Sequence, residues 1–162
     1  MKSAWALLLI GAAVLMPGCG PNGNAAALPA DATVSYTFRD SSMPPPYHRS
    51  FVITFDSTQA RIVVDSYGTV LADRTAPMPP ETWRQVSDTF ANLADVKVIE
   101  PEQGCTGGTG FALSVARAGS VTFDLAGTVC SGANSDAQER LREWIRPVRS
   151  LFPPMEQLAP EG

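Results

Sequence analysis

A strict alternation of apolar and polar residues recurs along this chain and limits its fold more than any other feature. A period of two is typical of strands that bury one face. The sequence therefore predicts an antiparallel sheet with one apolar face. The alternating apolar sets are Val34/Tyr36/Phe38, Phe51/Ile53/Phe55, Ala60/Ile62/Val64, Phe111/Leu113/Val115 and Val121/Phe123/Leu125.

The turns between these segments predict how the strands pair. Matching apolar faces aligns Phe55 with Ala60 across a four-residue loop, Val64 with Val70, and Val115 with Val121. The last two pairs leave three-residue loops, 66–68 and 117–119, which both end in glycine. Glycine suits that position because the third residue of such a loop is left-handed.

Two segments have the spacing of amphipathic helices, about Pro80 to Leu93 and about Asp136 to Leu151. Both apolar stripes need a sheet face to cover. We therefore expect an α+β fold with one antiparallel sheet of about six strands and two helices packed on one face. The expected order is four strands, a helix, two strands and a helix, with residues 96–99 as a candidate short edge strand.

The N-terminus indicates export. Lys2 precedes an apolar run, Trp5 to Leu15, that is too short to span a bilayer and fits a secretory signal. The run ends shortly before Gly18-Cys19, which resembles the lipobox of bacterial lipoproteins. The resemblance implies that Cys19 receives diacylglycerol and that cleavage precedes it. The alternative is an ordinary signal cut near residues 25–27, with Cys19 unused.

These features divide the chain into a lipoprotein signal peptide (1–18), a lipid-anchored flexible linker (19–32), a single α+β domain (33–153) and a C-terminal tail (154–162). The expected location is the cell envelope, on the extracytoplasmic side of a bacterial membrane, with the membrane reached through lipid on Cys19. Beyond the signal, the domain loosely resembles small uncharacterised lipoproteins of actinobacteria, and that resemblance implies no function.

The cysteines divide between two roles. The sequence has three, and lipid on Cys19 leaves Cys105 and Cys130 as an even pair in an exported chain. We expect them to form a disulfide that closes a loop of about 26 residues and stabilises the fold by roughly 3 kcal/mol. The glycines of 104–110 would give this loop slack, and a ligand-binding loop is the alternative.

Catalytic and metal sites are not indicated. Twelve Lys+Arg against 16 Asp+Glu disfavour nucleic acid as a partner. His48 is the single histidine, and no spacing of cysteines or histidines suggests redox catalysis or a metal ligand set. The carboxylates Asp65, Asp73 and Asp124 are scattered along the chain. We therefore predict no catalytic residue, no metal and no cofactor.

Two segments are candidates for recognition. Residues 39–49 contain an extended polyproline connector, and the candidate partner-binding loop consists of Pro44, Pro45, Pro46, Tyr47, His48 and Arg49. The alternative is a rigid crossover that only steers the next strand. Arg142, Arg146 and Arg149 form a stripe on the second helix, either a solvated face or a contact for anionic headgroups.

The sequence thus favours a lipid-anchored, non-enzymatic binding or envelope-accessory module with a possible protein partner in the envelope. One alternative is a secreted inhibitor of a protease or lysozyme that presents a rigid loop. The other is a hydrolase that uses His48 or the scattered carboxylates.

Overall fold

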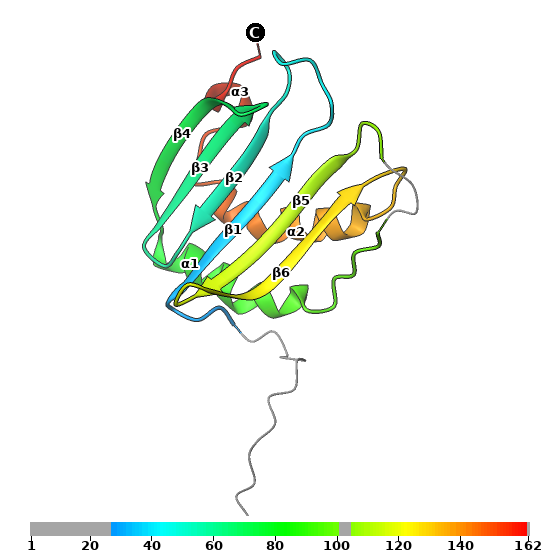
Figure 1. The fold of residues 1–162 in the computed structure, drawn as a ribbon. Coiled ribbons are helices and arrows are strands. Elements are labelled where there is room, and N and C mark those ends of the chain that lie inside the picture. Colours follow the sequence, from blue (N-terminus) through cyan, green and yellow to red (C-terminus); the bar gives the residue numbers. More distant parts are fainter. Residues whose placement is uncertain (1–26, 101–104, 162) are drawn as a thin grey trace, which may run out of the picture.

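Six strands pair into one antiparallel sheet in the computed structural model, which describes residues 27–100 and 105–161 (Figure 1). Their order across the sheet is β4-β3-β2-β1-β5-β6, so the first four form a meander and β5 returns to pair with β1. The strands are β1 (Ala32–Arg39), β2 (Ser50–Phe55), β3 (Gln59–Ser66), β4 (Thr69–Pro77), β5 (Thr109–Arg117) and β6 (Ser120–Val129).

The helices are α1 (Pro80–Thr89), the 3-10 helix η1 (Phe90–Leu93), α2 (Ser135–Arg149) and α3 (Met155–Leu158). Helices α1 and α2 lie behind the sheet in the view of Figure 1, and α3 lies near its upper end, next to β4. The predicted α+β class and the six-stranded antiparallel sheet are confirmed. The predicted order of elements is not, because the chain adds η1 and α3.

Residues 96–99 are not a strand. Instead, the side chain of Asn134 fastens them to the end of β6: its Nδ2 donates to Ile99 O (2.8 Å) and Thr128 O (2.9 Å), and its Oδ1 accepts from Ile99 N (2.8 Å). One amide thus supplies the backbone contacts that a strand partner would have supplied.

The core lies between the helices and the predicted apolar face of the sheet. The sheet contributes fully buried side chains such as Ile53, Ile62 and Leu113, and α2 contributes Leu141 and Val148. The predicted pairing of Phe55 with Ala60 is confirmed. Alternation therefore identified the buried face correctly along the central strands.

The register at the two glycine turns differs from the prediction. Val64 pairs with Ala72 and Val115 with Phe123, because a β-bulge interrupts each ladder near the turn. The loops then hold two residues, Tyr67-Gly68 and Ala118-Gly119, all with positive φ. Two-residue turns of this kind match strand twist, and a bulge moves the following residue to the other face. Val70 and Val121, expected inside, are 60% and 64% exposed.

Gly119→Ala should lower the free energy of unfolding by about 1–2 kcal/mol. The cost is conformational, because Gly119 has a φ of 79° and an added Cβ would meet no atom within 4 Å. Urea unfolding followed by circular dichroism measures the change. The neighbouring exposed Ser120→Ala is the control and should be close to neutral; equal stability of the two variants would contradict the turn assignment.

The packed unit extends beyond the predicted boundaries 33 and 153. Leu28, in the expected linker, is buried, and it exchanges hydrogen bonds with Ser87 of α1. Leu158 and Ala159, in the expected tail, are also buried. Both chain ends within the described range therefore belong to the folded domain.

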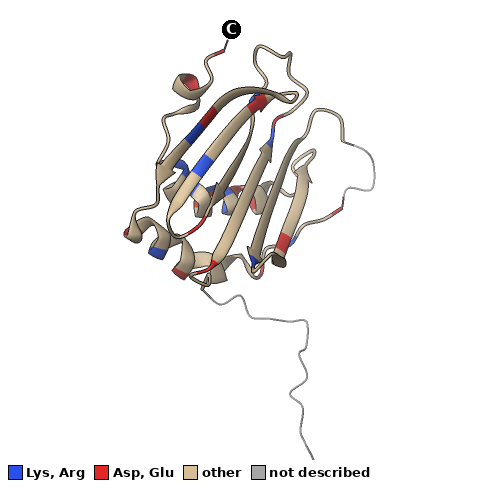
Figure 2. Cartoon of the chain, turned by 60° about the vertical axis from the view of Figure 1, so that its left-hand side comes forward, with Lys and Arg blue, Asp and Glu red and all other residues tan. Residues whose placement is uncertain are grey.

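The second face of the sheet carries no helix in the part of the chain that the structure describes. Small and polar side chains line its centre, among them Ser35, Thr37, Thr54, Ala112 and Ser114. Figure 2 shows that charged residues are sparse along these central strands. The buried and uncovered faces thus differ in the way that alternation predicts for a two-layer fold.

Candidate functional site

The loop of residues 40–49, which contains the candidate partner-binding residues 44–49, is fastened to the neighbouring β3–β4 hairpin. Its backbone turns at Pro44, whose carbonyl accepts a hydrogen bond from His48 N (3.1 Å). The hydroxyl of Tyr67, in the hairpin turn, donates to Met43 O (2.6 Å). The expected extended polyproline connector is therefore a turn held in place from one side.

His48 is buried beneath this loop. Its ring stacks on Tyr67 with 4.0 Å between centroids, and its Nε2 lies 3.3 Å from Ser50 Oγ. Its Nδ1 is buried and has no hydrogen-bond partner among the described residues. A serine hydrolase needs a carboxylate at that nitrogen to orient the imidazole. The contact between His48 and Ser50 therefore lacks the third member of a triad.

Arg49 also points inward and holds the C-terminal segment. It is 8% exposed, and it donates from Nε to Ala159 O (2.8 Å) and from Nη2 to Pro160 O (2.6 Å). Of the candidate loop, Pro44, Pro45, Pro46 and Tyr47 face solvent, whereas His48 and Arg49 join the loop to the body of the domain.

Arg49→Met should lower the free energy of unfolding by about 2 kcal/mol. Methionine keeps the apolar stem but leaves the carbonyls of residues 159 and 160 without their donor. Urea unfolding gives the change in stability, and hydrogen exchange over 155–161 should become faster. Arg39→Met, at an exposed position of β1, is the matched control; if its effect were as large, the clamp would not be the cause.

The predicted disulfide between Cys105 and Cys130 is present, with 5.7 Å between the two Cα atoms. Gly108 packs against it: an added Cβ would lie 2.5 Å from Cys105 Sγ and 2.5 Å from Val129 O. A side chain at Gly108 would therefore clash with the disulfide and with the end of β6. Within the described residues, the glycine-rich segment that follows Cys105 thus packs closely against the disulfide.

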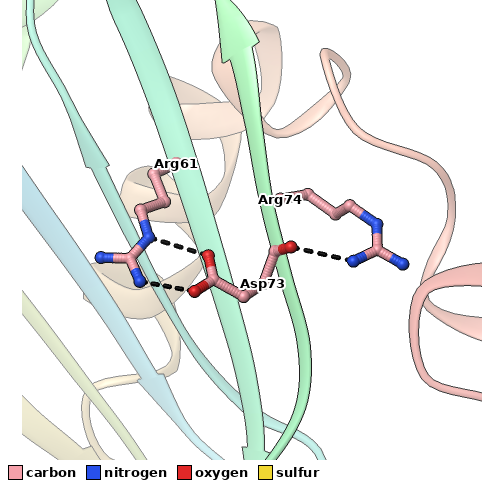
Figure 3. A network of polar contacts seen from close by, with 3 residues as sticks. All are labelled: Arg61, Asp73 and Arg74. Carbon is pink, nitrogen blue, oxygen red and sulfur yellow. Dashed lines mark hydrogen bonds and ion pairs between the residues drawn. The ribbon is translucent and has the colours of Figure 1, made fainter.

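The carboxylates considered for hydrolysis do not converge. Asp73 forms a two-pronged ion pair with Arg61 (2.8 and 2.5 Å), and its backbone carbonyl accepts from Arg74 (2.9 Å; Figure 3). The hydrogen bond from Arg61 lowers the pKa of Asp73. Asp65 accepts the backbone N–H of the β3–β4 turn, and Asp124 lies on β6, at the far edge of the sheet. Across residues 27–100 and 105–161, no three His, Cys, Asp or Glu side chains group as metal ligands.

A groove of about 490 Å³ separates α2 from the ends of the central strands. The sheet supplies its floor through Tyr36, Phe38 and Phe51, and α3 contributes Met155. One wall is the predicted arginine stripe of α2. A volume of this size is typical of small-molecule sites, which combine apolar walls with a few placed polar groups. The remaining lining residues are Thr109, Gln138, Glu139, Arg142, Glu143, Ile145, Arg146 and Arg149.

The hydroxyl of Tyr36 is the unusual group in this groove. Tyr36 is 1% exposed, and its hydroxyl has no hydrogen-bond partner among the described residues. Burial raises the pKa of this phenol to about 12, so it stays neutral and able to donate. Buried hydroxyls without partners are rare in native proteins. Alternation in the sequence placed Tyr36 on the inward face of its strand. A tyrosine at such a position signals that its hydroxyl needs a hydrogen-bond partner, and the sequence offered no further sign of the groove.

The arginine stripe is partly paired. Arg142 lies 3.5 Å from Glu139 and Arg146 lies 3.3 Å from Glu143, with all four side chains more than half exposed. Arg149 is half-buried and donates to carbonyls that precede α3. Three arginines against two glutamates leave the groove with one excess positive charge.

This arrangement can bind and orient a ligand. His48, Ser50 and the disulfide lie outside the set of groove-lining residues, and both groove glutamates face arginines. The groove therefore offers donors, positive charge and apolar surface to a ligand.

Within the described residues, no helix is long and apolar enough to cross a membrane. Comparisons with known proteins give no relative from which to assign a function: no family model, curated protein or solved structure matches this chain.

Proposed function

We propose that this chain is a bacterial lipoprotein whose mature domain is a non-enzymatic binding module of the cell envelope, with the groove as its ligand site. The buried, unpartnered hydroxyl of Tyr36 at the groove floor carries the proposal. An unpaired buried donor costs about 1–3 kcal/mol, a cost that an acceptor on a ligand would remove.

Two observations support an extracytoplasmic location. The apolar run 5–15 is followed by Cys19 at lipobox spacing. The disulfide between Cys105 and Cys130 is of a kind that persists in oxidising compartments. Cys19 itself lies outside the described residues, so the anchor is proposed from sequence. Two or more acyl chains on one cysteine would hold the domain stably at a membrane.

Labelling tests the anchor. Cells that express the full chain are fed an alkyne analogue of palmitate and then fractionated. The wild-type chain should carry the label and sediment with membranes, whereas Cys19→Ser should lose both properties. The pair Cys105→Ser and Cys130→Ser should keep the label, because neither cysteine is the acceptor. An unlabelled wild-type chain would contradict the anchor.

Filling the groove tests the ligand site. The full chain in phosphatidylcholine nanodiscs is titrated by calorimetry with octanoate, octanol and octylamine, and empty discs are subtracted. At least one probe should bind, and Met155→Trp, which fills the groove, should abolish that binding. Val70→Trp places the same ring on an exposed edge and should leave it unchanged. The absence of binding by all three probes would refute the groove as a ligand site.

An inhibitor is the second candidate, because Met43 and Tyr47 are 44% and 46% exposed on a fastened loop. A loop held in its bound shape loses less entropy on binding. Inhibition of a protease or of lysozyme that Tyr47→Ala removes would favour this function. Turnover of a hydrolase substrate that depends on His48 would instead favour an enzyme.

A further inference from the structure

We infer that the groove binds a free amphipathic anion: an acyl or aryl chain that ends in one carboxylate or phosphate. The acidic head would lie at Tyr36 and Arg142, and the apolar body on Phe38 and Phe51. This inference rests on the proposed function, because it names the ligand class of the same groove.

The floor of the groove suits an apolar body. The rings of Phe38 and Phe51 lie 5.3 Å apart between centroids, and those of Tyr36 and Phe51 lie 6.0 Å apart. These aromatic side chains thus form a continuous platform at the end of β1 and the start of β2. Phe38 and Phe51 are only partly buried, so apolar surface stays open to a ligand. Contact with an acyl or aryl chain would remove that surface from water.

The polar groups of the groove select an acidic head. Tyr36 has a neutral hydroxyl with an unused donor, and the three arginines outnumber the two glutamates. Hydrogen bonds from neutral and cationic donors to a carboxylate or phosphate are stronger than those to a neutral acceptor. A cationic head would be repelled by the arginines. A neutral head would gain only the hydrogen bond from the Tyr36 hydroxyl.

Arg142 is the second group that we expect to meet the acidic head. Arg142 and Glu139 line the groove together with Tyr36, whose hydroxyl oxygen has almost no contact with solvent. Their own ion pair is 3.5 Å long, and both side chains are about 60% exposed. Exposed pairs of this kind contribute little to stability. Arg142 can therefore turn from Glu139 to an incoming anion.

The position of the groove favours a free ligand over a headgroup of the anchoring bilayer. Its floor lies at the end of β1, where Phe38 pairs with Phe51 and Phe111. The chain enters β1 at the opposite end, where Ala32 pairs with Arg117. The point where the chain enters the sheet and the groove therefore lie at opposite ends of β1.

The three octyl probes, used with the full chain in phosphatidylcholine nanodiscs, test the ligand class. Octanoate should bind about tenfold more tightly than octanol, and octylamine should bind most weakly. A tenfold preference is the usual scale for one added charge-assisted hydrogen bond. Replacing a third of the disc lipid with phosphatidylglycerol should leave octanoate affinity unchanged, because the ligand is free and not a headgroup.

Two variants test whether Tyr36 and Arg142 bind the acidic head of the ligand. Tyr36→Phe should weaken octanoate binding about tenfold and octanol binding by less, and it should raise the unfolding midpoint of the ligand-free protein, since it removes an unpaired hydroxyl. Tyr67→Phe is its control outside the groove. Arg142→Gln should weaken octanoate binding and leave octanol binding unchanged, and Arg84→Gln, on the exposed surface of α1, should change neither.

Each failure has a separate meaning. Equal affinity for octanoate and octanol, or tighter binding of octylamine, would overturn the acidic head while the groove remained a binding site. Competition by phosphatidylglycerol would overturn the free ligand. If none of the three probes binds, the proposed function itself fails.

Discussion

Replacing Trp144 with alanine should lower the free energy of unfolding by about 3–5 kcal/mol. Trp144 is 7% exposed and joins three elements. Its ring lies 6.2 Å from that of Phe55 on β2 and 5.8 Å from that of Phe90 on η1. Its indole Nε1 donates to Val86 O of α1 (3.0 Å). Truncation would leave a cavity where the sheet, α2 and the α1–η1 segment meet.

Urea unfolding followed by far-ultraviolet circular dichroism measures this effect without relying on the removed fluorophore. Trp144→Phe is the matched variant, because it keeps a ring against Phe55 and Phe90 but loses the hydrogen bond to Val86. It should cost about 1–2 kcal/mol. A loss below 1 kcal/mol for Trp144→Ala would mean that the helices do not depend on this side chain for docking.

Removing the disulfide should lower the free energy of unfolding by about 3.5 kcal/mol. Cys105 and Cys130 are separated by 25 positions, so the bond restricts a sizeable loop of the unfolded chain. The double variant Cys105→Ala and Cys130→Ala removes the bond without leaving free thiols. The fold should persist under native conditions, since the buried side chains of β1, β2 and β3 lie outside the closed loop.

Denaturant unfolding of the oxidised wild type, the reduced wild type and the double variant tests this prediction. The last two should agree with each other and lie well below the first. Added reductant should leave the double variant unchanged, which separates loss of the disulfide from other effects of the reagent. Equal midpoints for all three would contradict a stabilising role.

The sequence allowed the buried face of the sheet to be predicted because alternation depends only on backbone geometry. It also located the turn glycines Gly68 and Gly119 correctly. It did not reveal the two bulges. Matching apolar residues across each turn pairs Val64 with Val70 and Val115 with Val121, and that register needs no extra residue in either strand. The bulges let Tyr67 and Ala118 take positive φ and turn Val70 and Val121 outward.

The groove was beyond sequence reasoning for a different reason. The arginine stripe of α2 was visible from helical spacing, but its distance from Tyr36 depends on how α2 crosses the sheet. The inward direction of Arg49 depends on α3, whose four residues are too few for a periodic pattern. Local pattern therefore predicted elements, whereas the candidate site arises from contacts between residues distant in the chain.

The two bulges have a consequence for crowded surfaces. They lie in the outermost strand pairs, β3–β4 and β5–β6, next to the strands that end the sheet. Bulges twist an outer strand away from a flat template, and Pro77 removes a donor at the end of β4. Molecules tethered in the plane of a bilayer collide far more often than the same molecules in bulk. If the domain is anchored as we propose, these interrupted outer strands would keep neighbouring copies on one membrane from joining into a continuous sheet.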